Sequence, residues 1–283
     1  MSKTSIAWTE RTWNPVTGCT KYSAGCAHCY AEVMAKRLQG MGQKRYANGF
    51  ELTLHPEALN EPKKVKEPSM FFVCSMADLF HDDVPFEFID EVLRTIGECP
   101  QHTFQLLTKR TANMHDFFTH GRRVPDNCWI GTTVESGEYA HRVEILSDIP
   151  AKVKFLSIEP LVGEMGWLNL SGIDWVIVGG ESGNQARPMK KFWVIDIKTQ
   201  CSLQGVPFFF KQWGTYGEDG VKRDKKANGC LLNGEVCQEW PKVLSAPMKR
   251  TSKEFCDEIT RHIQVMADNN TLFGNCGKKG GEK

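Results

Sequence analysis

Three features that would assign a cellular setting or a partner are missing from this sequence of 283 residues. No run approaches the roughly 18 apolar residues of a membrane-spanning helix, and the opening MSKTSIAWTERTWNP has no apolar core of a secretory signal. Net charge is only +1, from 35 basic and 34 acidic residues, so no overall field indicates nucleic acid. We therefore expect a cytoplasmic protein that does not use a membrane, with any nucleic-acid contact confined to a local patch.

A regular disulfide spacing and internal repeats are also missing. The eleven cysteines are an odd number and most are scattered along the chain. In a reducing cytoplasm, clustered cysteines are more often metal ligands or catalytic thiols than disulfides. The one cluster is GCTKYSAGCAHCY, in which Cys19, Cys26 and Cys29 fall within eleven residues.

Three thiols this close can converge on one metal centre. Gly18 and Gly25 each stand directly before a cysteine and allow the backbone to fold back. Thiolates favour zinc or an iron–sulfur cluster. A structural zinc takes four protein ligands, and His28, Cys74 or His81 could supply the fourth. A cubane cluster held by three cysteines leaves one iron free to bind something else.

The pattern CxxxxxxCxxCY resembles the cluster loop of the radical SAM superfamily, whose usual spacing is CxxxCxxC. The three extra residues cost only about 0.5 kcal/mol of loop closure. The chain also closely resembles an uncharacterised radical-SAM-like family often encoded by phages and prophages, through TWNPVTGC, FVCSMADLF, LLTKR, SIEPL, VGGESG and FFFKQWG, between Trp8 and Trp240. This resemblance implies a [4Fe-4S] cluster on Cys19, Cys26 and Cys29, S-adenosylmethionine on the free iron, and an external electron donor.

Short apolar runs alternate with helical patterns in most of the chain. The runs are Met70–Cys74, Thr103–Leu107, Cys128–Gly131, Val153–Leu156, Trp175–Val178 and Pro207–Phe210, and the helical patterns are Ala31–Gln39, Phe86–Cys99, Ala112–Thr119, Tyr139–Ser147 and Phe192–Gln204. Consecutive apolar positions are typical of parallel strands buried on both faces. The alternation predicts an α/β fold, a partial or closed (β/α) barrel of six parallel strands, or seven with Trp13–Val16. An open doubly wound sheet remains an alternative.

The remaining segments predict a small extension after the barrel. Residues 1–216 would form the barrel with its cluster loop, including a connector at 41–68 with at most one short helical piece. Residues 217–270 would add a hairpin around Asn233-Gly234 and an amphipathic helix at 251–266. The composition of residues 271–283 predicts a disordered tail.

Polar residues follow almost every predicted strand, and in a parallel α/β fold these ends share the rim where active sites lie. The cofactor-binding candidates on this rim are Ser75, Asp78, Thr132, Glu159, Gly179, Gly180 and Glu181, and the catalytic candidates are Glu159 and Lys211. Glu159 and Glu181 are the carboxylates that we expect to meet an ammonium or a ribose. In the superfamily a GGE motif contacts the methionyl amino group but follows an early strand, whereas VGGESG follows a late one. For Arg110, Thr133 and Asp148 we favour an ordinary structural role where the chain turns.

Two functions compete. The resemblance implies an enzyme that cleaves S-adenosylmethionine to a deoxyadenosyl radical, which takes hydrogen from a small-molecule or nucleic-acid substrate; phage association suggests a nucleoside or nucleic acid by analogy. The alternative is a zinc-stabilised, non-catalytic nucleic-acid-binding protein, with a basic face formed by Lys109, Arg110, Lys190, Lys191 and Lys211. Near-zero net charge and a rim rich in glutamate argue against this alternative, because carboxylates repel phosphates.

Overall fold

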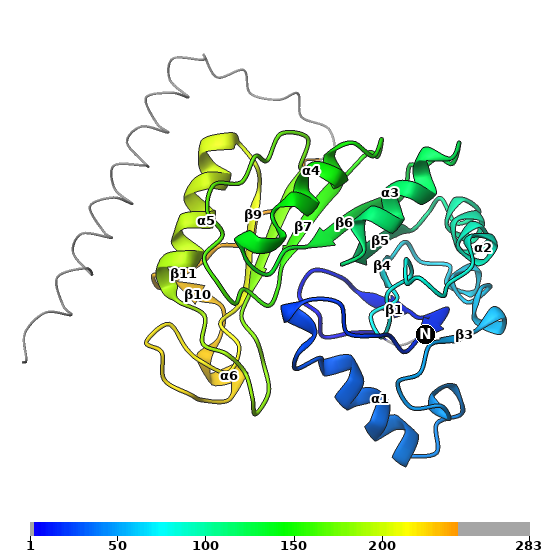
Figure 1. The fold of residues 1–283 in the computed structure, drawn as a ribbon, viewed down its shortest axis with the longest axis horizontal. Coiled ribbons are helices and arrows are strands. Elements are labelled where there is room, and N and C mark those ends of the chain that lie inside the picture. The colour runs from blue at the N-terminus through cyan, green and yellow to red at the C-terminus, as the bar shows by residue number, and fades with distance from the viewer. Residues whose placement is uncertain (1–2, 243–283) are drawn as a thin grey trace, which may run out of the picture.

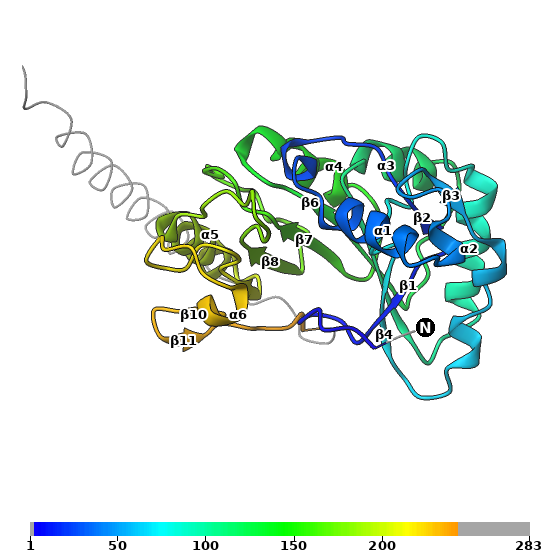
Figure 2. The same ribbon diagram turned by 90° about the horizontal axis from the view of Figure 1, so that it is seen from below.

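A computed structural model describes residues 3–242, which are built around a seven-stranded parallel sheet. The strands are β1 (Arg11–Trp13), β4 (Met70–Val73), β5 (Thr103–Thr108), β6 (Cys128–Thr133), β7 (Lys154–Ile158), β8 (Trp175–Gly179) and β9 (Phe208–Gln212). They lie side by side in this order, so β1 and β9 are the two edges. The sheet curves into a half-barrel (Figures 1 and 2). The predicted α/β partial barrel is confirmed, with seven strands and without closure among the described residues.

Helices cover the outer face of this sheet (Figure 1). They are α2 (Phe86–Gly97), α3 (Thr111–Thr119), α4 (His141–Ser147) and α5 (Lys191–Gln204), while α1 (Tyr30–Gly40) follows the cysteine loop and α6 (Lys225–Asn228) precedes the C-terminal hairpin. In α2 the buried residues Phe88, Ile89, Val92 and Ile96 recur at helical spacing and pack on the strands. The five predicted helices are therefore confirmed, with shifts of one or two residues at their ends.

The connection from β7 to β8 contains no helix. Residues 159–174 instead run along α5, where the Leu168 N–H donates to Gln200 Oε1 at 2.8 Å and the Leu170 N–H to Gln204 Oε1 at 2.9 Å. Leu168 and Leu170 are both buried in the main core. This segment thus covers the outer face where a crossover helix would otherwise lie.

Alternate side chains of each strand point to opposite faces, and the two faces differ. The outward set, such as Phe71 and Val73 of β4, joins the main core under the helices. The inward set forms a second apolar cluster of Phe72, Trp129, Phe155, Trp175, Ile177 and Phe209, together with Trp8 and Val153, which precede β1 and β7. Glu159 and Lys211 come from the strand ends beyond this cluster and are only partly buried. The concave face is therefore apolar toward the start of the strands and polar at their carboxyl ends.

The connector at 41–68 is more structured than the sequence predicted. It contains three short 3₁₀ helices, Lys44–Tyr46, Pro56–Ala58 and Pro62–Lys64, and a two-residue strand β3 (Thr53–Leu54) that pairs with β2 (Val16–Thr17). The expectation of at most one helical piece was wrong, because Pro56 and Pro62 occupy first positions of short helices, where proline fits. None of the helices that the structure describes has the length and apolar character that crossing a bilayer requires.

The described part of the C-terminal extension packs against the barrel edge. Strands β10 (Leu231–Leu232) and β11 (Glu235–Val236) form the predicted hairpin, with Asn233 and Gly234 at positive φ in its turn. Residues 237–239 then run antiparallel to β9, since the Phe210 N–H donates to Cys237 O at 2.7 Å and the Glu239 N–H to Phe208 O at 3.0 Å. The helix expected at 251–266 and the tail expected at 271–283 lie outside the described residues.

Candidate functional site

The cysteine loop begins at a clamped glycine. Gly18 has φ +78°, and a Cβ on it would lie 2.1 Å from the carbonyl oxygen of Glu51. Its N–H donates to Met76 O at 3.1 Å, and the Cys19 N–H donates to Phe50 O at 3.1 Å. The backbone just before the first thiol is therefore held between the connector and the segment after β4, and only glycine fits there.

The middle of the loop is tied to the end of β6. The Ser23 hydroxyl donates to Glu135, whose side chain has no solvent exposure and also accepts from Arg142 Nη1 at 3.0 Å. A Cβ on Gly25 would lie 2.6 Å from Glu135 Cγ, so the loop backbone lies directly against this carboxylate. Since Glu135 follows β6, these contacts hold the loop over the carboxyl ends of the strands.

A second tie joins the loop to the segment after β8. Arg187 donates to the two carboxylate oxygens of Glu181 at 2.7 and 2.9 Å and to Ala24 O at 3.0 Å. His28 Nδ1 lies 3.4 Å from Glu181 Oε1. Burial raises the pKa of Glu181, but the hydrogen bonds from Arg187 outweigh it, so the pKa lies below its usual value. We call these four residues the Arg187 latch.

The three thiols are free and half-buried, and they come from one loop. Within residues 3–242, no three His, Cys, Asp or Glu side chains lie close enough together to hold a metal ion. Cys19 Sγ donates to Thr20 O at 3.4 Å, and burial together with the Asp78 charge raises the pKa of its thiol to about 11. Three thiolates are the right donor set for an iron–sulfur cluster, so the residues fit it in kind.

Among the described residues, none of the possible fourth zinc ligands lies with the thiols in a group that could hold a metal ion. His28 lies against Glu181, and His81 Nε2 lies 2.7 Å from the Thr20 hydroxyl. Cys74 is 2 % exposed in the main core, where burial raises its pKa. In the described part of the chain His81 and Cys74 are thus committed elsewhere, while His28 Nδ1 is buried beside Glu181 without a hydrogen-bond partner.

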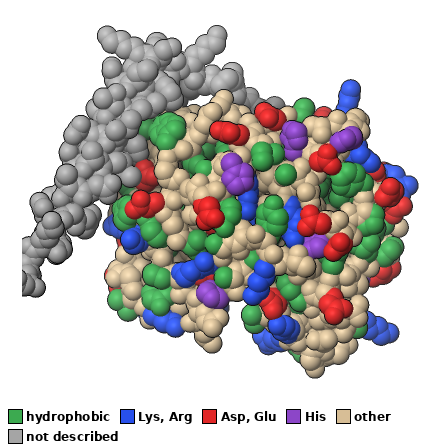
Figure 3. Space-filling view, viewed as in Figure 1, with side chains coloured by type: hydrophobic (Ala, Val, Ile, Leu, Met, Phe, Trp, Pro, Cys, Tyr) green, Lys and Arg blue, Asp and Glu red, His purple; other side chains and the backbone are tan. Residues whose placement is uncertain are grey.

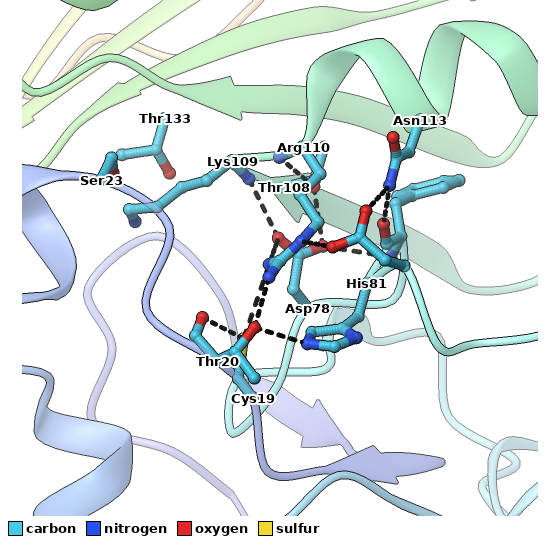
Figure 4. Close-up of polar contacts among 12 residues, drawn as sticks. Cys19, Thr20, Ser23, Asp78, His81, Thr108, Lys109, Arg110, Asn113 and Thr133 are labelled. Atoms are coloured by element: carbon cyan, nitrogen blue, oxygen red, sulfur yellow. Dashed lines mark hydrogen bonds and ion pairs between the residues drawn. The ribbon is translucent and has the colours of Figure 1, made fainter.

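A buried polar network lies behind the first cysteine (Figure 4). Asp78 accepts from the Thr108 hydroxyl at 2.7 Å and from the Lys109 N–H at 3.2 Å. Arg110, only 2 % exposed, lies between Asp78 and the loop. Asp78 therefore joins the segment after β4 to the end of β5, and its oxygens already have protein partners.

On the concave face an ion pair joins two strand ends. Lys211 Nζ lies 2.7 and 2.8 Å from the two oxygens of Glu159, and the two side chains are 17 % and 19 % exposed. A Cβ on Gly179 would lie 3.2 Å from the Glu159 carboxyl carbon, so this glycine leaves room for it.

The structure brings some of the predicted residues together and separates others. The Tyr30 hydroxyl donates to the carbonyl of Ser75, which places Ser75 beside the end of the loop. Thr132 is fully buried, and its hydroxyl bonds to Thr111 and to Thr108 O, at 3.1 Å for the carbonyl. A Cβ on Gly180 would overlap the carbonyl oxygen of Trp213. Ser75, Glu159 and Lys211 are thus accessible, while Thr132 and Gly180 serve packing.

A cleft of about 510 Å³ opens beside the first cysteine. Its walls are Cys19, Thr20, Lys36, Gln39, Asn48, Gly49, Phe50, Glu51, Leu52, His81 and Asp83. Charges of both signs line it, and acidic and basic side chains are likewise mixed over the face in Figure 3. The cleft gives solvent a path to Cys19 from the side of the connector.

Sequence reasoning missed the residues that hold the loop in place. Arg187 follows Glu181 by six positions in a loop, and no periodicity links an arginine there to Ala24. Glu135 was one of many polar residues after a strand. Tyr30 had a usable signal, because it directly follows Cys29.

Comparisons with known proteins give one family and one distant group of structures. The family model described as "Protein of unknown function (DUF5131)" matches residues 3–241. The search of curated proteins finds no match. Among solved structures, spore photoproduct lyase complexed with dinucleoside spore photoproduct is 14 % identical, with a TM-score of 0.46 over 92 % of this chain and 75 % of that one.

Two mutants of the same lyase are similar at the same level. One, with bound AdoMet and dinucleoside spore photoproduct, is 13 % identical, with a TM-score of 0.43 over 91 % of this chain and 74 % of that one. For the other, 12 % identical with a TM-score of 0.43, the match covers 62 % of this chain and 57 % of that one. A likeness this distant assigns no reaction to the present chain.

Proposed function

Because the chain belongs to the DUF5131 family, whose description states no activity, we propose its function from the site itself: an iron–sulfur enzyme of the radical SAM type. The observation that carries this proposal is the position of the cysteine loop. Three free thiols lie on one loop that follows the first strands and is tied to the ends of β6 and β8. Carboxyl ends of parallel strands are where α/β enzymes build their active sites.

The proposed cluster ligands are Cys19, Cys26 and Cys29. A bound [4Fe-4S] cluster would pass one electron, taken from an external donor, to S-adenosylmethionine, giving methionine and a deoxyadenosyl radical that takes a hydrogen atom from the substrate. The protein's own part is to hold the loop, to orient the sulfonium and to exclude water. Ser23, Ala24 and His28 supply the contacts that hold the loop.

Among the cofactor candidates, accessibility favours Ser75 and Glu159 for S-adenosylmethionine. Glu181 is saturated by Arg187, so an ammonium would have to displace a bidentate guanidinium. Asp78 is similarly engaged by Thr108 and Lys109. We therefore give Glu181 and Asp78 positioning roles in this enzyme.

The Glu159–Lys211 pair is the proposed polar centre on the concave face. Lys211 donates to both carboxylate oxygens, so the pair presents an ammonium as well as a carboxylate to anything bound beside it. Such a pair suits a substrate or cosubstrate that carries hydroxyl groups. A nucleoside or nucleic acid remains the proposed substrate class, and phage association remains a prediction.

The zinc-stabilised nucleic-acid-binding alternative is not favoured. Its basic face requires exposed, unpaired cations, yet Arg110 is 2 % exposed and lies beside Asp78 and Asp82. Lys211 is paired with Glu159, and Lys191 lies 2.6 Å from Glu218. Charges neutralised within the protein contribute little to phosphate binding.

Metal analysis tests the proposal. We expect anaerobically reconstituted protein to bind about four irons and matching sulfide per chain, with broad absorbance near ~400 nm. A variant with Cys19, Cys26 and Cys29 changed to Ala should bind none. As a matched control, Cys74→Ser should keep the cluster, because that thiol lies in the core. Stoichiometric zinc without iron uptake, or iron retained by the triple variant, would refute the assignment.

A further inference from the structure

Arg110 is the strongest unexplained feature near the proposed cluster. An arginine that is only 2 % exposed is unusual, because a buried charge is costly unless it is paired. It follows Thr108, at the end of β5, and directly precedes α3. The proposed reaction as stated so far gives it no task.

Two different sets of partners surround the guanidinium (Figure 4). Nε lies 3.2 Å from Asp82 Oδ2, and Nη1 lies 3.5 Å from Asp78 Oδ2. Nη2 donates to the Thr20 hydroxyl at 2.8 Å, and Nη1 donates to Cys19 Sγ at 3.7 Å. The planar fork thus joins the ends of the sheet to the start of the cysteine loop.

The contacts beyond the fork make this arrangement rigid. Thr20 also lies 2.7 Å from His81 Nε2, so its hydroxyl is held from two sides. Tyr22 places its ring 4.7 Å from the guanidinium carbon. Asp82 accepts from Asn113 Nδ2 at 2.8 Å, which ties it to α3. Only a residue with five donors in a fixed plane can meet all these partners at once.

From this geometry, and resting on the proposed function, we propose that Arg110 is a positioning residue that donates to the Cys19 sulfur, fixes that ligand, and makes the bound cluster easier to reduce. Hydrogen bonds to the sulfurs and local charge set the reduction potential of iron–sulfur clusters. Reduction adds one electron from the external donor and breaks no bond at Cys19. The positive charge beside the sulfur stabilises the added negative charge, and it also offsets Asp78.

Arg110→Gln removes the charge and leaves Asp78 uncompensated. We expect the equilibrium for one-electron reduction to become about tenfold less favourable, equal to about 59 mV toward negative potential. Arg110→Lys keeps the charge but cannot span the same partners, so its shift should have the same sign and be smaller. The midpoint potential is measured by redox titration with electron paramagnetic resonance, on protein matched for iron and sulfide content.

Arg122→Gln is the control for charge. It removes the same unit charge from a residue that pairs with Asp90 at 2.8 Å and lies over the Phe117 ring, with no cysteine among its contacts. Its potential should equal that of the unchanged protein. A merely structural role for Arg110 would lower stability without moving the potential.

The outcomes separate this inference from the proposed function. A negative shift in both Arg110 variants, with none in Arg122→Gln, supports it. If Arg110→Gln does not fold, the shift in Arg110→Lys decides. Unchanged potentials in cluster-loaded Arg110 variants overturn the inference and leave the proposed function standing. Failure of the unchanged protein to take up iron overturns both.

Discussion

The Arg187 latch should contribute measurably to folding, and Arg187→Gln tests this. The substitution removes two hydrogen bonds to the Glu181 carboxylate and one to Ala24 O, and it leaves Glu181, with a side chain 5 % exposed, without its main partner. A hydrogen bond to a charged group contributes about 1.5–3 kcal/mol. Since the Arg187 side chain is 31 % exposed, solvent screening reduces the total. We expect a loss of about 2–3 kcal/mol in the free energy of unfolding.

Urea denaturation followed by tryptophan fluorescence measures this loss. Hydrogen exchange of residues 23–28 measures it locally, because the latch holds these amides near the strand ends. Arg223→Gln is the matched control: it breaks a similar pair with Asp219, at 2.8 and 2.6 Å, but both side chains are about half exposed. That variant should lose much less stability than Arg187→Gln, because solvent screens an exposed pair.

A double change of Arg187 and Glu181 to Gln separates the pair from its surroundings. It should cost less than the sum of the single changes, because the second removes a carboxylate that the first has left with only the backbone N–H of residue 187, at 2.8 Å, as a hydrogen-bond donor from that residue. The reasoning fails if Arg187→Gln stays within about 0.5 kcal/mol of the unchanged protein and the loop amides exchange at unaltered rates.

The remaining predictions concern the loop glycine, the concave pair and acid stability. Gly18→Ala should lower the free energy of unfolding by more than about 2 kcal/mol and loosen Cys19, because the new Cβ would overlap Glu51 O. The control Gly42→Ala, at φ +71° with nothing within 4 Å, should lower it by only about 1 kcal/mol. Thermal unfolding compares the two variants. Glu159→Gln should weaken S-adenosylmethionine binding to cluster-loaded protein about 10- to 150-fold in calorimetric titration; unchanged affinity with lost turnover would move Glu159 to the substrate. Because the pKa of Glu181 is below its ordinary 4.5, its contribution to stability is present above that pH and lost as pH falls through the folded value; Arg187→Gln removes the side-chain bond that lowers this pKa, so the loss should shrink in urea titrations.

The strands were predictable because their residues are buried on both faces. Runs such as 175–178 and 207–210 are apolar at every position, as the two clusters on either side of the sheet require. Strand order was not predictable, because it depends on which connection packs on which face. The non-helical connection between β7 and β8 was not predictable either, because its backbone N–H groups bond to Gln200 and Gln204 of α5, which lie more than 30 residues further along the chain.

The candidate site was predictable in kind but not in pairing. A cysteine cluster and polar strand ends can be read directly, and Gly18 and Gly25 do occupy close-packed positions. The sequence alone could not predict that the Thr132 hydroxyl bonds to Thr111 of α3. It also could not predict that Arg187 donates to both carboxylate oxygens of Glu181. The sequence predicted only an ordinary structural role for Arg110 and did not predict its contact with Cys19. The direction of a side chain at a strand end depends on the tertiary fold.

Cleavage of S-adenosylmethionine by the cluster-loaded protein is the measurement that tests the central claim most directly. With a strong reductant and no oxygen, we expect 5′-deoxyadenosine and methionine to form in equal amounts, detected by chromatography and mass spectrometry, and neither to form with the variant that lacks Cys19, Cys26 and Cys29. Protein that carries about four irons per chain, binds S-adenosylmethionine and yet forms no 5′-deoxyadenosine under reduction would contradict the account.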